Sequence, residues 1–280
     1  MVGQKKSKLR AVWLGQALRE IRDLAGLNSK DAGAYLGKDG STVIRMENGD
    51  VPVSEPMLEA FMEMCGVTDP HKRAELMTIR KDVAQKGWWD GYKGDVAATL
   101  MDRAWMESKA VSIRAFEPAC LPGLLQTPEY AETLMRARSP ETSDAEIERW
   151  VDMRMARQYV LTRHRPVAFS VIITQHLLTM DIDRETMRLQ LSHLADMADR
   201  PNVELHVLPE RVCTGVEGPF EVFELAEPYP EIAYVTTPAG EICLEEDPVV
   251  RLHHTYDRLL DACLPHVASK ALIIAERDNL

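Results

Sequence analysis

Residues 39–49 read DGSTVIRMENG, and this stretch decides the fold of the N-terminal part of the chain. Three consecutive β-branched residues in its middle favour a strand by propensity. Its other features favour a helix: Asp39 is a good N-cap, Val43 and Met46 are spaced to share one helix side, and Gly49 suits a helix end. Because β-branched residues cost a helix only a few tenths of a kcal/mol each, we predict a helix here.

Similar signals predict four more short helices around this one. Leu14, Leu18 and Ile21 recur at helical spacing before Gly26, and Asn28 can cap the next helix. The five expected helices cover residues 12–25, 28–36, 39–48, 54–65 and 69–87. Two helices joined by a tight turn of three to four residues have the geometry of a helix-turn-helix, whose second helix enters the major groove of DNA. The helix at residues 39–48 takes that place here.

The sequence pattern changes after Trp88. Strand-like runs alternate with helical stretches, so we predict an α+β fold with a mostly antiparallel sheet and flanking helices. The expected strands are residues 167–174, 203–208, 219–225, 232–236 and 241–244. The expected helices are residues 97–109, one beginning at Thr127–Pro128, 143–164, 184–198 and 249–264. We therefore predict two domains, an all-α domain at residues 1–87 and an α+β domain at residues 88–280.

The charge of the chain is unevenly distributed. The 280 residues carry a net charge of −11, which by itself argues against binding nucleic acid. Residues 1–50, however, contain nine basic and six acidic residues, so this segment is +3 and the remaining 230 residues carry −14. A small basic module joined to a larger acidic one predicts separate tasks for the two parts.

Several classes of protein are not supported by the sequence. It has no apolar run long enough for a membrane span and no secretory signal, and its five scattered cysteines suit a reducing compartment. We expect a cytoplasmic protein that associates with the nucleoid when bound to DNA. The pair His253–His254 with Asp257 has helical spacing but no evident third metal ligand. No motif for a cofactor, a metal or catalysis is present, so we predict no cofactor and no enzymatic activity.

Two groups of motifs resemble known families. The pattern from Leu14 to Leu27, LGQALREIRDLAGL, and the closing Glu47-Asn48-Gly49 resemble the phage-repressor-like (XRE-type) helix-turn-helix domain. The strings LPGLLQTPEYA at residues 121–131 and RMARQ at residues 154–158 are similar to a C-terminal domain of unknown function found in many actinomycete regulators. Trp88-Trp89, Gly218-Pro219-Phe220 and Tyr234-Val235 are further markers.

The resemblance implies a DNA-binding transcriptional regulator. Genes of this family often lie beside one for a small acidic partner protein, in an arrangement likened to a toxin and antitoxin pair. The chain departs from the family where Ser29 and Gly40 replace glutamines and where Ile44 replaces a frequent serine. Because long amide side chains that read adenine are missing there, the resemblance does not carry over an operator sequence.

The helix-turn-helix supplies the candidate DNA-binding residues. If Val43 and Met46 face the core, then Ser41, Ile44 and Arg45 face the groove. Arg45 suits a bidentate contact to guanine and Ile44 a thymine methyl group, against the alternatives of a surface arginine and a buried isoleucine. The remaining candidates lie near helix N-termini or the turn, where phosphate contacts are expected: Ser29, Lys30, Lys38, Gly40 and Thr42. Basic residues of the N-terminal arm could add phosphate contacts, or could simply be solvated: Lys5, Lys6, Lys8 and Arg10.

The resemblance also implies a salt bridge between Arg22 and Glu47. In the second domain, five polar residues of the motifs are candidates for a ligand or partner site: Gln126, Tyr130, Arg154, Arg157 and Gln158. The alternative is structural: Tyr130 packs in the core, and the arginines pair with acids such as Glu146 and Glu148.

The function predicted from the sequence is that of a homodimeric, DNA-binding transcriptional regulator, whose second domain dimerises and receives a small partner protein or ligand. Two alternatives remain. One is an antitoxin-like protein that sequesters a partner and binds DNA only for autoregulation. The other is a ligand-sensing or enzymatic second domain.

Overall fold

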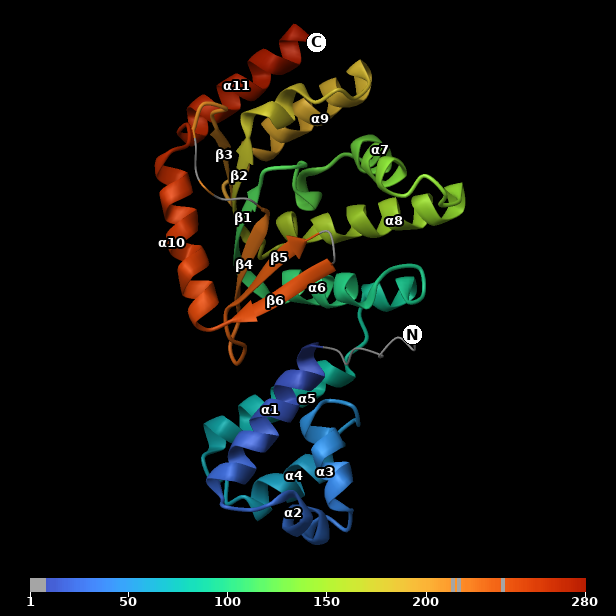
Figure 1. The fold of residues 1–280 in the computed structure, drawn as a ribbon, viewed down its shortest axis with the longest axis vertical. Coiled ribbons are helices and arrows are strands. Elements are labelled where there is room, and N and C mark those ends of the chain that lie inside the picture. The colour runs from blue at the N-terminus through green and yellow to red at the C-terminus, as the bar shows by residue number, and fades with distance from the viewer. Residues whose placement is uncertain (1–8, 213–214, 216–217, 238–239) are drawn as a thin grey trace. The chain divides into compact units, whose positions relative to one another are not determined.

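The computed structural model describes residues 9–212, 215, 218–237 and 240–280, and the chain divides into two compact units, residues 1–91 and 92–280. Figure 1 shows a helical first unit and a second unit built around a sheet. Within the described residues, no helix is both long enough and apolar enough to cross a membrane.

The first unit contains the five predicted helices. They are α1 (Leu9–Leu24), α2 (Ser29–Tyr35), α3 (Gly40–Glu47), α4 (Glu55–Met64) and α5 (Pro70–Ala84). Side chains at i, i+3 and i+4 positions form one buried core. It includes Trp13, Leu14, Leu18, Val43, Met46, Leu58, Phe61, Met62 and Leu76. The predicted fifth helix extends too far, because the chain becomes extended at Gln85.

The sequence contains the signals that begin and end these helices. The side chains of Asn28, Asp39 and Ser54 accept backbone hydrogen bonds at the N-termini of α2, α3 and α4. Gly49 adopts a φ of 74°, which a residue with a side chain rarely takes up, and it ends the stretch quoted above. The helix at residues 39–49 is therefore confirmed, in spite of its β-branched centre.

The second unit is α+β, as predicted. Its strands are β1 (Ala110–Glu117), β2 (Ala168–Thr174), β3 (Val203–Leu208), β4 (Phe220–Leu225), β5 (Ile232–Thr237) and β6 (Gly240–Glu245). Its helices are α6 (Ala98–Lys109), α7 (Pro128–Arg138), α8 (Asp144–Arg157), α9 (Arg184–Met197), α10 (Asp247–Asp261) and α11 (His266–Asn279).

The six strands form one mixed sheet in the order β3-β2-β1-β4-β5-β6. The pairs β3–β2 and β2–β1 are parallel, whereas β1–β4, β4–β5 and β5–β6 are antiparallel. The antiparallel pairs are thus in the majority, as predicted. Strand β1 joins the two parts of the sheet, and it is the strand that the sequence analysis did not predict.

Two further elements differ from the predictions. The long helix expected at residues 143–164 ends at Arg157 and continues only as a short 3₁₀ helix, Gln158–Leu161. Pro166 follows closely and cannot continue a regular helix. Helix α11 was not predicted, although Pro265 lies directly before it.

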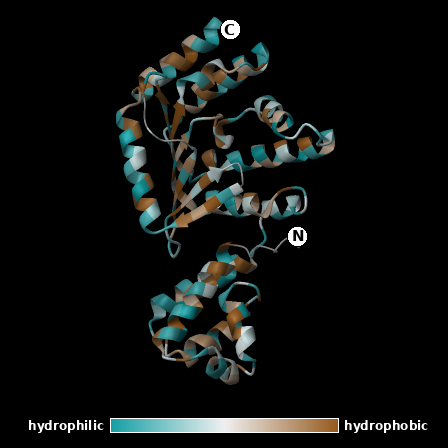
Figure 2. Cartoon of the chain, in the orientation of Figure 1, coloured by the Kyte–Doolittle hydropathy of each residue, from teal (hydrophilic) through white to brown (hydrophobic). Residues whose placement is uncertain are grey.

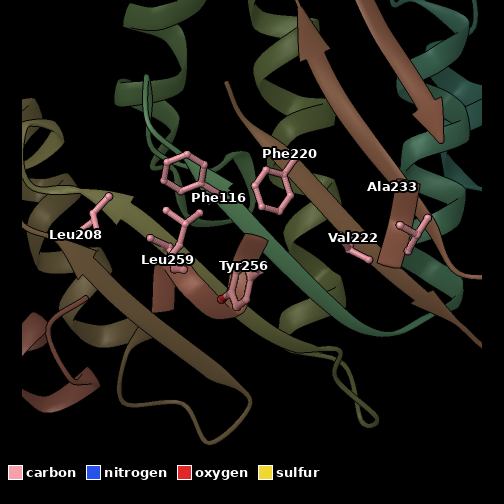
Figure 3. Packing of buried hydrophobic residues seen from close by; sticks show 9 residues of the cluster. Phe116, Leu208, Phe220, Val222, Ala233, Tyr256 and Leu259 are labelled. Carbon is pink, nitrogen blue, oxygen red and sulfur yellow. The ribbon is translucent and has the colours of Figure 1, made fainter. Parts of the chain in front are cut away.

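The two faces of the sheet differ in character. Strand residues that alternate along the chain pack against α10 on one face, where Phe116 and Phe220 meet Tyr256 and Leu259 (Figure 3). Figure 2 shows hydrophilic and hydrophobic bands along α10, as expected of a helix with one buried side. Strand neighbours of the opposite parity, such as Glu117 and Glu221, point to the other face. That second face contains the buried charges described below.

Candidate functional site

Helices α2 and α3 are held tightly together by a small residue and by capped ends. A Cβ atom placed on Gly33, inside α2, would lie 2.8 Å from the carbonyl oxygen of Lys38 and 2.8 Å from the carbonyl carbon of Asp39. Only glycine allows so close an approach between α2 and the turn. Asp39 then accepts a 2.7 Å hydrogen bond from the Thr42 amide and starts α3. Gly33 and the Asp39 cap therefore fix the helix pair.

Helix α3 presents one side to the core and the other to solvent. Val43 and Met46 are buried at 0% and 4% exposure, whereas Ile44 is 44% exposed. Ser41 and Arg45 are also exposed. The structure therefore places the three residues expected to face the groove on the solvent side, and Ile44 is not the buried isoleucine of the alternative reading.

The other DNA-binding candidates lie on the same helix pair. Lys30 and Lys38 are exposed, while Ser29, Gly40 and Thr42 are half-buried. Gly40 lies close to α2, because an added Cβ would be 3.1 Å from the Lys30 backbone. The absence of a side chain at Gly40 therefore allows the close contact between α2 and α3.

Hydrogen bonds from Ser41 and Thr42 favour the ionised form of the Asp39 carboxylate at the start of α3. The Ser41 hydroxyl donates a 2.6 Å hydrogen bond to the carboxylate of Asp39. That bond, followed by the bonds from Thr42, lowers the pKa of Asp39 below its ordinary value. Asp39 therefore stays ionised at neutral pH, and Ser41 supports the cap at the same time as it faces solvent.

The predicted bridge between Arg22 and Glu47 is present and buried. Arg22 Nε donates to Glu47 Oε1 at 2.5 Å, and Arg22 Nη2 donates to Glu47 Oε2 at 3.0 Å. Arg22 also donates to the Leu27 carbonyl at 2.7 Å, and Arg19 reaches Glu47 from the next turn of α1. This two-point contact joins α1 to the end of α3 and so sets the orientation of α3.

One residue of the predicted basic arm, Arg10, is not where the sequence placed it. Arg10, which the sequence analysis placed in a solvated or phosphate-binding arm, is 1% exposed and donates a 2.7 Å hydrogen bond to the Asp82 carbonyl. It belongs to the contact between α1 and α5, because α1 begins at Leu9. Lys5, Lys6 and Lys8 lie outside the described residues.

In the second unit, the two motif strings converge on one loop. Gln126 Nε2 donates to the Leu121 carbonyl at 2.6 Å, and Gln158 Nε2 donates to the Gln126 carbonyl at 2.7 Å. Arg154 Nη1 donates to Gln126 Oε1 at 2.5 Å. Gln190 of α9, which the sequence analysis did not single out, accepts from the Thr127 amide at 2.7 Å. The three glutamines thus hold the backbone of residues 121–127 through side-chain hydrogen bonds.

Most of the five candidate residues of this unit are interior. Gln126, Tyr130 and Arg157 are 1%, 0% and 3% exposed. Arg157 forms a buried ion pair with Glu107 of α6, at 2.6 Å. The structural alternative considered above named the wrong acids, since Glu146 instead completes the cap of α8 with Ser143. Arg154 is half-buried and has no carboxylate partner among the described residues.

A set of buried charges surrounds this cluster on the second face of the sheet. Arg103 contacts Glu221 at 2.8 Å and Glu241 at 2.9 Å. Burial, reinforced by the nearby Glu221, raises the pKa of Glu117 to about 8. Burial also lowers the pKa of Arg154 to about 10, with a further contribution from Arg157. Groups with shifted pKa values in one place are typical of functional sites and of structural ion networks alike.

Two family models match the chain. A helix-turn-helix domain matches residues 13–76. A domain of unknown function, DUF5753, matches residues 100–275, which is more than half of the chain. The chain belongs to the DUF5753 family. No curated protein and no solved structure matches it.

These matches cover both groups of candidate residues. The helix-turn-helix match includes α2, α3 and both partners of the buried bridge, and it indicates a DNA-binding regulator. The DUF5753 match includes the converging motif strings and the buried charges. The description of this family names no function for that region.

Several residues of the DUF5753 region were missed by sequence reasoning. Arg103 and Glu107 lie on α6 and look like ordinary surface charges of an amphipathic helix.

Asp257 does not join a metal site: it accepts from Arg114 at 3.0 Å, while His253 lies 3.4 Å from Glu231. Among the residues that the structure describes, no three histidine, cysteine, aspartate or glutamate side chains are grouped so as to hold a metal ion.

Proposed function

We propose that the chain is a sequence-specific transcriptional regulator that inserts α3 into the major groove of its operator. The observation that carries this proposal is the division of α3 into two sides. Val43 and Met46 anchor the helix, which leaves Ile44 and Arg45 exposed next to each other. In the helix-turn-helix docking geometry, side chains on the outer side of the second helix reach base edges.

Each exposed group has a chemical task in this proposal. The guanidinium of Arg45 donates to O6 and N7 of a guanine, and Ile44 contacts a thymine methyl group. Ser29, Lys30, Lys38, Gly40, Ser41 and Thr42 contact phosphates. Phosphate contacts set the register of the protein on DNA, while base contacts give sequence choice.

The proposal assigns dimerisation and signal reception to the second unit. Helix-turn-helix proteins bind as dimers to half-sites about one helical turn apart, which supports a symmetric operator. The proposal of a small partner protein is supported by the resemblance of the sequence to regulators whose genes lie beside one for such a protein. Sedimentation of the purified full chain, alone and with the product of a neighbouring gene, tests both assignments.

The test of DNA binding uses promoter fragments from the genomic neighbourhood of the gene. The full chain should shift at least one fragment in a gel at low ionic strength, and unlabelled competitor of random sequence should not abolish the shift. Specific binding should weaken as salt rises, because phosphate contacts release counterions. A chain that shifts none of these fragments, with or without its neighbours' products, would contradict the proposal.

A further inference from the structure

The second unit contains a cleft at the side of the motif cluster. It has a volume of about 240 Å³ and lies between the start of α6, the end of α7 and the middle of α8. Its lining residues are Asp95, Val96, Ala97, Leu100, Met135, Arg138, Ser139, Trp150 and Arg154. A smaller hollow of about 40 Å³ shares Met135, Arg138 and Arg154 with it and extends the cleft towards Cys120 and Gln126.

The charges of the cleft are unbalanced in favour of cations. Asp95 is its only acidic lining residue, and that carboxylate is engaged by Arg149 at 2.7 Å. Arg138 and Arg154 form no ion pair among the described residues, and the acid that interacts with both, Glu117, has a pKa that burial raises to about 8. Half of the other described arginines of this unit do form an ion pair, and the seven are Arg103, Arg114, Arg136, Arg149, Arg157, Arg188 and Arg277. An excess of positive charge is unexpected in a unit with a strongly acidic composition.

The guanidinium of Arg154 is held by a side-chain hydrogen bond. Its Nη1 donates to a neutral acceptor, Gln126 Oε1, and Gln126 is itself fixed by the Leu121 carbonyl. A Cβ on Gly123 would lie 3.1 Å from the Arg154 side chain, so this glycine leaves room for the guanidinium. Burial lowers the pKa of Arg154, and an anion in the cleft would offset that cost. The guanidinium is thus pre-oriented with donors still available.

The cleft also has an apolar part. Val96, Ala97, Leu100 and Met135 provide aliphatic surface. The indole of Trp150 is fixed by a 2.7 Å hydrogen bond from its Nε1 to the Asp95 carbonyl. A mostly apolar hollow with a few converging polar groups is the usual form of a small-molecule site, and drug-sized ligands need roughly 300–1,000 Å³. The volume here fits something smaller.

We propose that this cleft binds a small monocarboxylate with an apolar body. The carboxylate accepts hydrogen bonds from Arg154 and Arg138, and the apolar part lies against Leu100, Met135 and Trp150. Guanidinium and carboxylate groups match in geometry and form strong charge-assisted bonds. The proposal rests on the assignment of signal reception to the second unit, and it names the class of signal.

Octanoate serves as the probe, in calorimetric titrations of the purified full chain without DNA. Wild type should bind it saturably with one site per chain. Octan-1-ol, which has the same chain without the charge, should bind at least about tenfold more weakly, the loss expected for a hydrogen bond to a charged group. Arg154→Gln should weaken octanoate binding to a similar extent.

Two other variants keep the test decisive if Arg154→Gln disturbs folding. Arg138→Gln changes an exposed side chain, and Ala97→Phe fills the cleft from an exposed position; both should weaken octanoate binding while the melting temperature stays near that of wild type. Arg251→Gln, on α10, is the matched control and should bind like wild type. The proposal is wrong if octanoate does not bind, if octanol binds equally well, or if Arg138→Gln and Ala97→Phe leave the affinity unchanged.

The same proteins distinguish this proposal from the DNA-binding function. Gel shifts without octanoate test operator binding alone. If no DNA fragment shifts but octanoate still binds, the proposed DNA-binding function is wrong and the proposed carboxylate site is retained. If DNA fragments shift but octanoate does not bind, the proposed carboxylate site is wrong and the proposed DNA-binding function is retained.

Discussion

The candidate site residues of the two units lie in opposite environments. In the first unit, the stretch DGSTVIRMENG forms a helix whose exposed residues, including Ile44 and Arg45, are the ones available to a partner. In the second unit, Gln126, Tyr130 and Arg157 come from equally recognisable strings and are buried. A sequence motif can therefore mark a surface in one domain and an internal framework in the next, and exposure decides between the two.

The buried bridge of the first unit should give the largest effect. Glu47→Ala leaves Arg22 buried without its main partner, so we expect a loss of about 3–5 kcal/mol in the free energy of unfolding. Hydrogen exchange should show that the loss is concentrated in α1 and α3. Glu59→Ala, on the exposed side of α4, is the control and should change little. An unchanged melting temperature in Glu47→Ala would show that the bridge does not orient α3.

The corresponding pair of the second unit sharpens the comparison. Arg157→Met leaves Glu107 buried and uncompensated, and should destabilise the protein by about 3–5 kcal/mol. Combining it with Glu107→Met should recover most of that loss, because an apolar pair can replace a buried ion pair. Denaturant unfolding of the three variants measures this. If the single variant were as stable as wild type, the ion pair between Arg157 and Glu107 would not contribute to the stability of the fold.

The exposed side of α3 should give an intermediate effect of a different kind. Arg45→Ala should weaken binding to the specific operator by about 1–3 kcal/mol and relax the choice at one base pair. The melting temperature should not change, since Arg45 is exposed. Fluorescence anisotropy with specific and random duplexes measures both affinities. The control is Lys81→Ala on α5, and equal losses in the two variants would refute a base contact by Arg45.

The last prediction concerns pH and applies to the second unit. Burial raises the pKa of Glu117 to about 8, so the folded chain holds a proton that the unfolded chain releases near pH 4. The folded state is then favoured at low pH, and its stability falls as pH rises from about 5 to 8, by at most about 1.4 kcal/mol per pH unit for one proton. Glu117→Gln should flatten this dependence in pH-resolved thermal unfolding. An equal slope in both proteins would exclude Glu117 as the cause.

Local signals made the first unit predictable. Caps such as Asn28 and Asp39 and the glycines that end the helices act within a few residues of each other, so the sequence alone located the helix pair. The orientation of α3 also followed from helical spacing, with Val43 and Met46 on one side. The fate of Arg10 did not follow, because its burial depends on Asp82, 72 residues away.

The second unit depends more on distant partners. Strand β1 lies directly after α6 with no glycine or proline between them, and its polar residues Ser112 and Arg114 obscure its apolar alternation. Its neighbours in the sheet come from residues 168–173 and 220–225. Arg154 and Arg157 are only three residues apart, yet Arg154 lines a cleft and Arg157 pairs with Glu107. No rule of spacing distinguishes those two outcomes.

The central place of β1 has a consequence for synthesis on the ribosome. One of its edges is covered once residues 168–173 have emerged, but the other has no partner until residues 220–225 follow. In the interval, the nascent chain exposes unpaired backbone groups at the middle of its future sheet, and such edges promote association between chains. A stalled or truncated product ending between these points should aggregate, whereas one ending before β1 should release only the small helical unit.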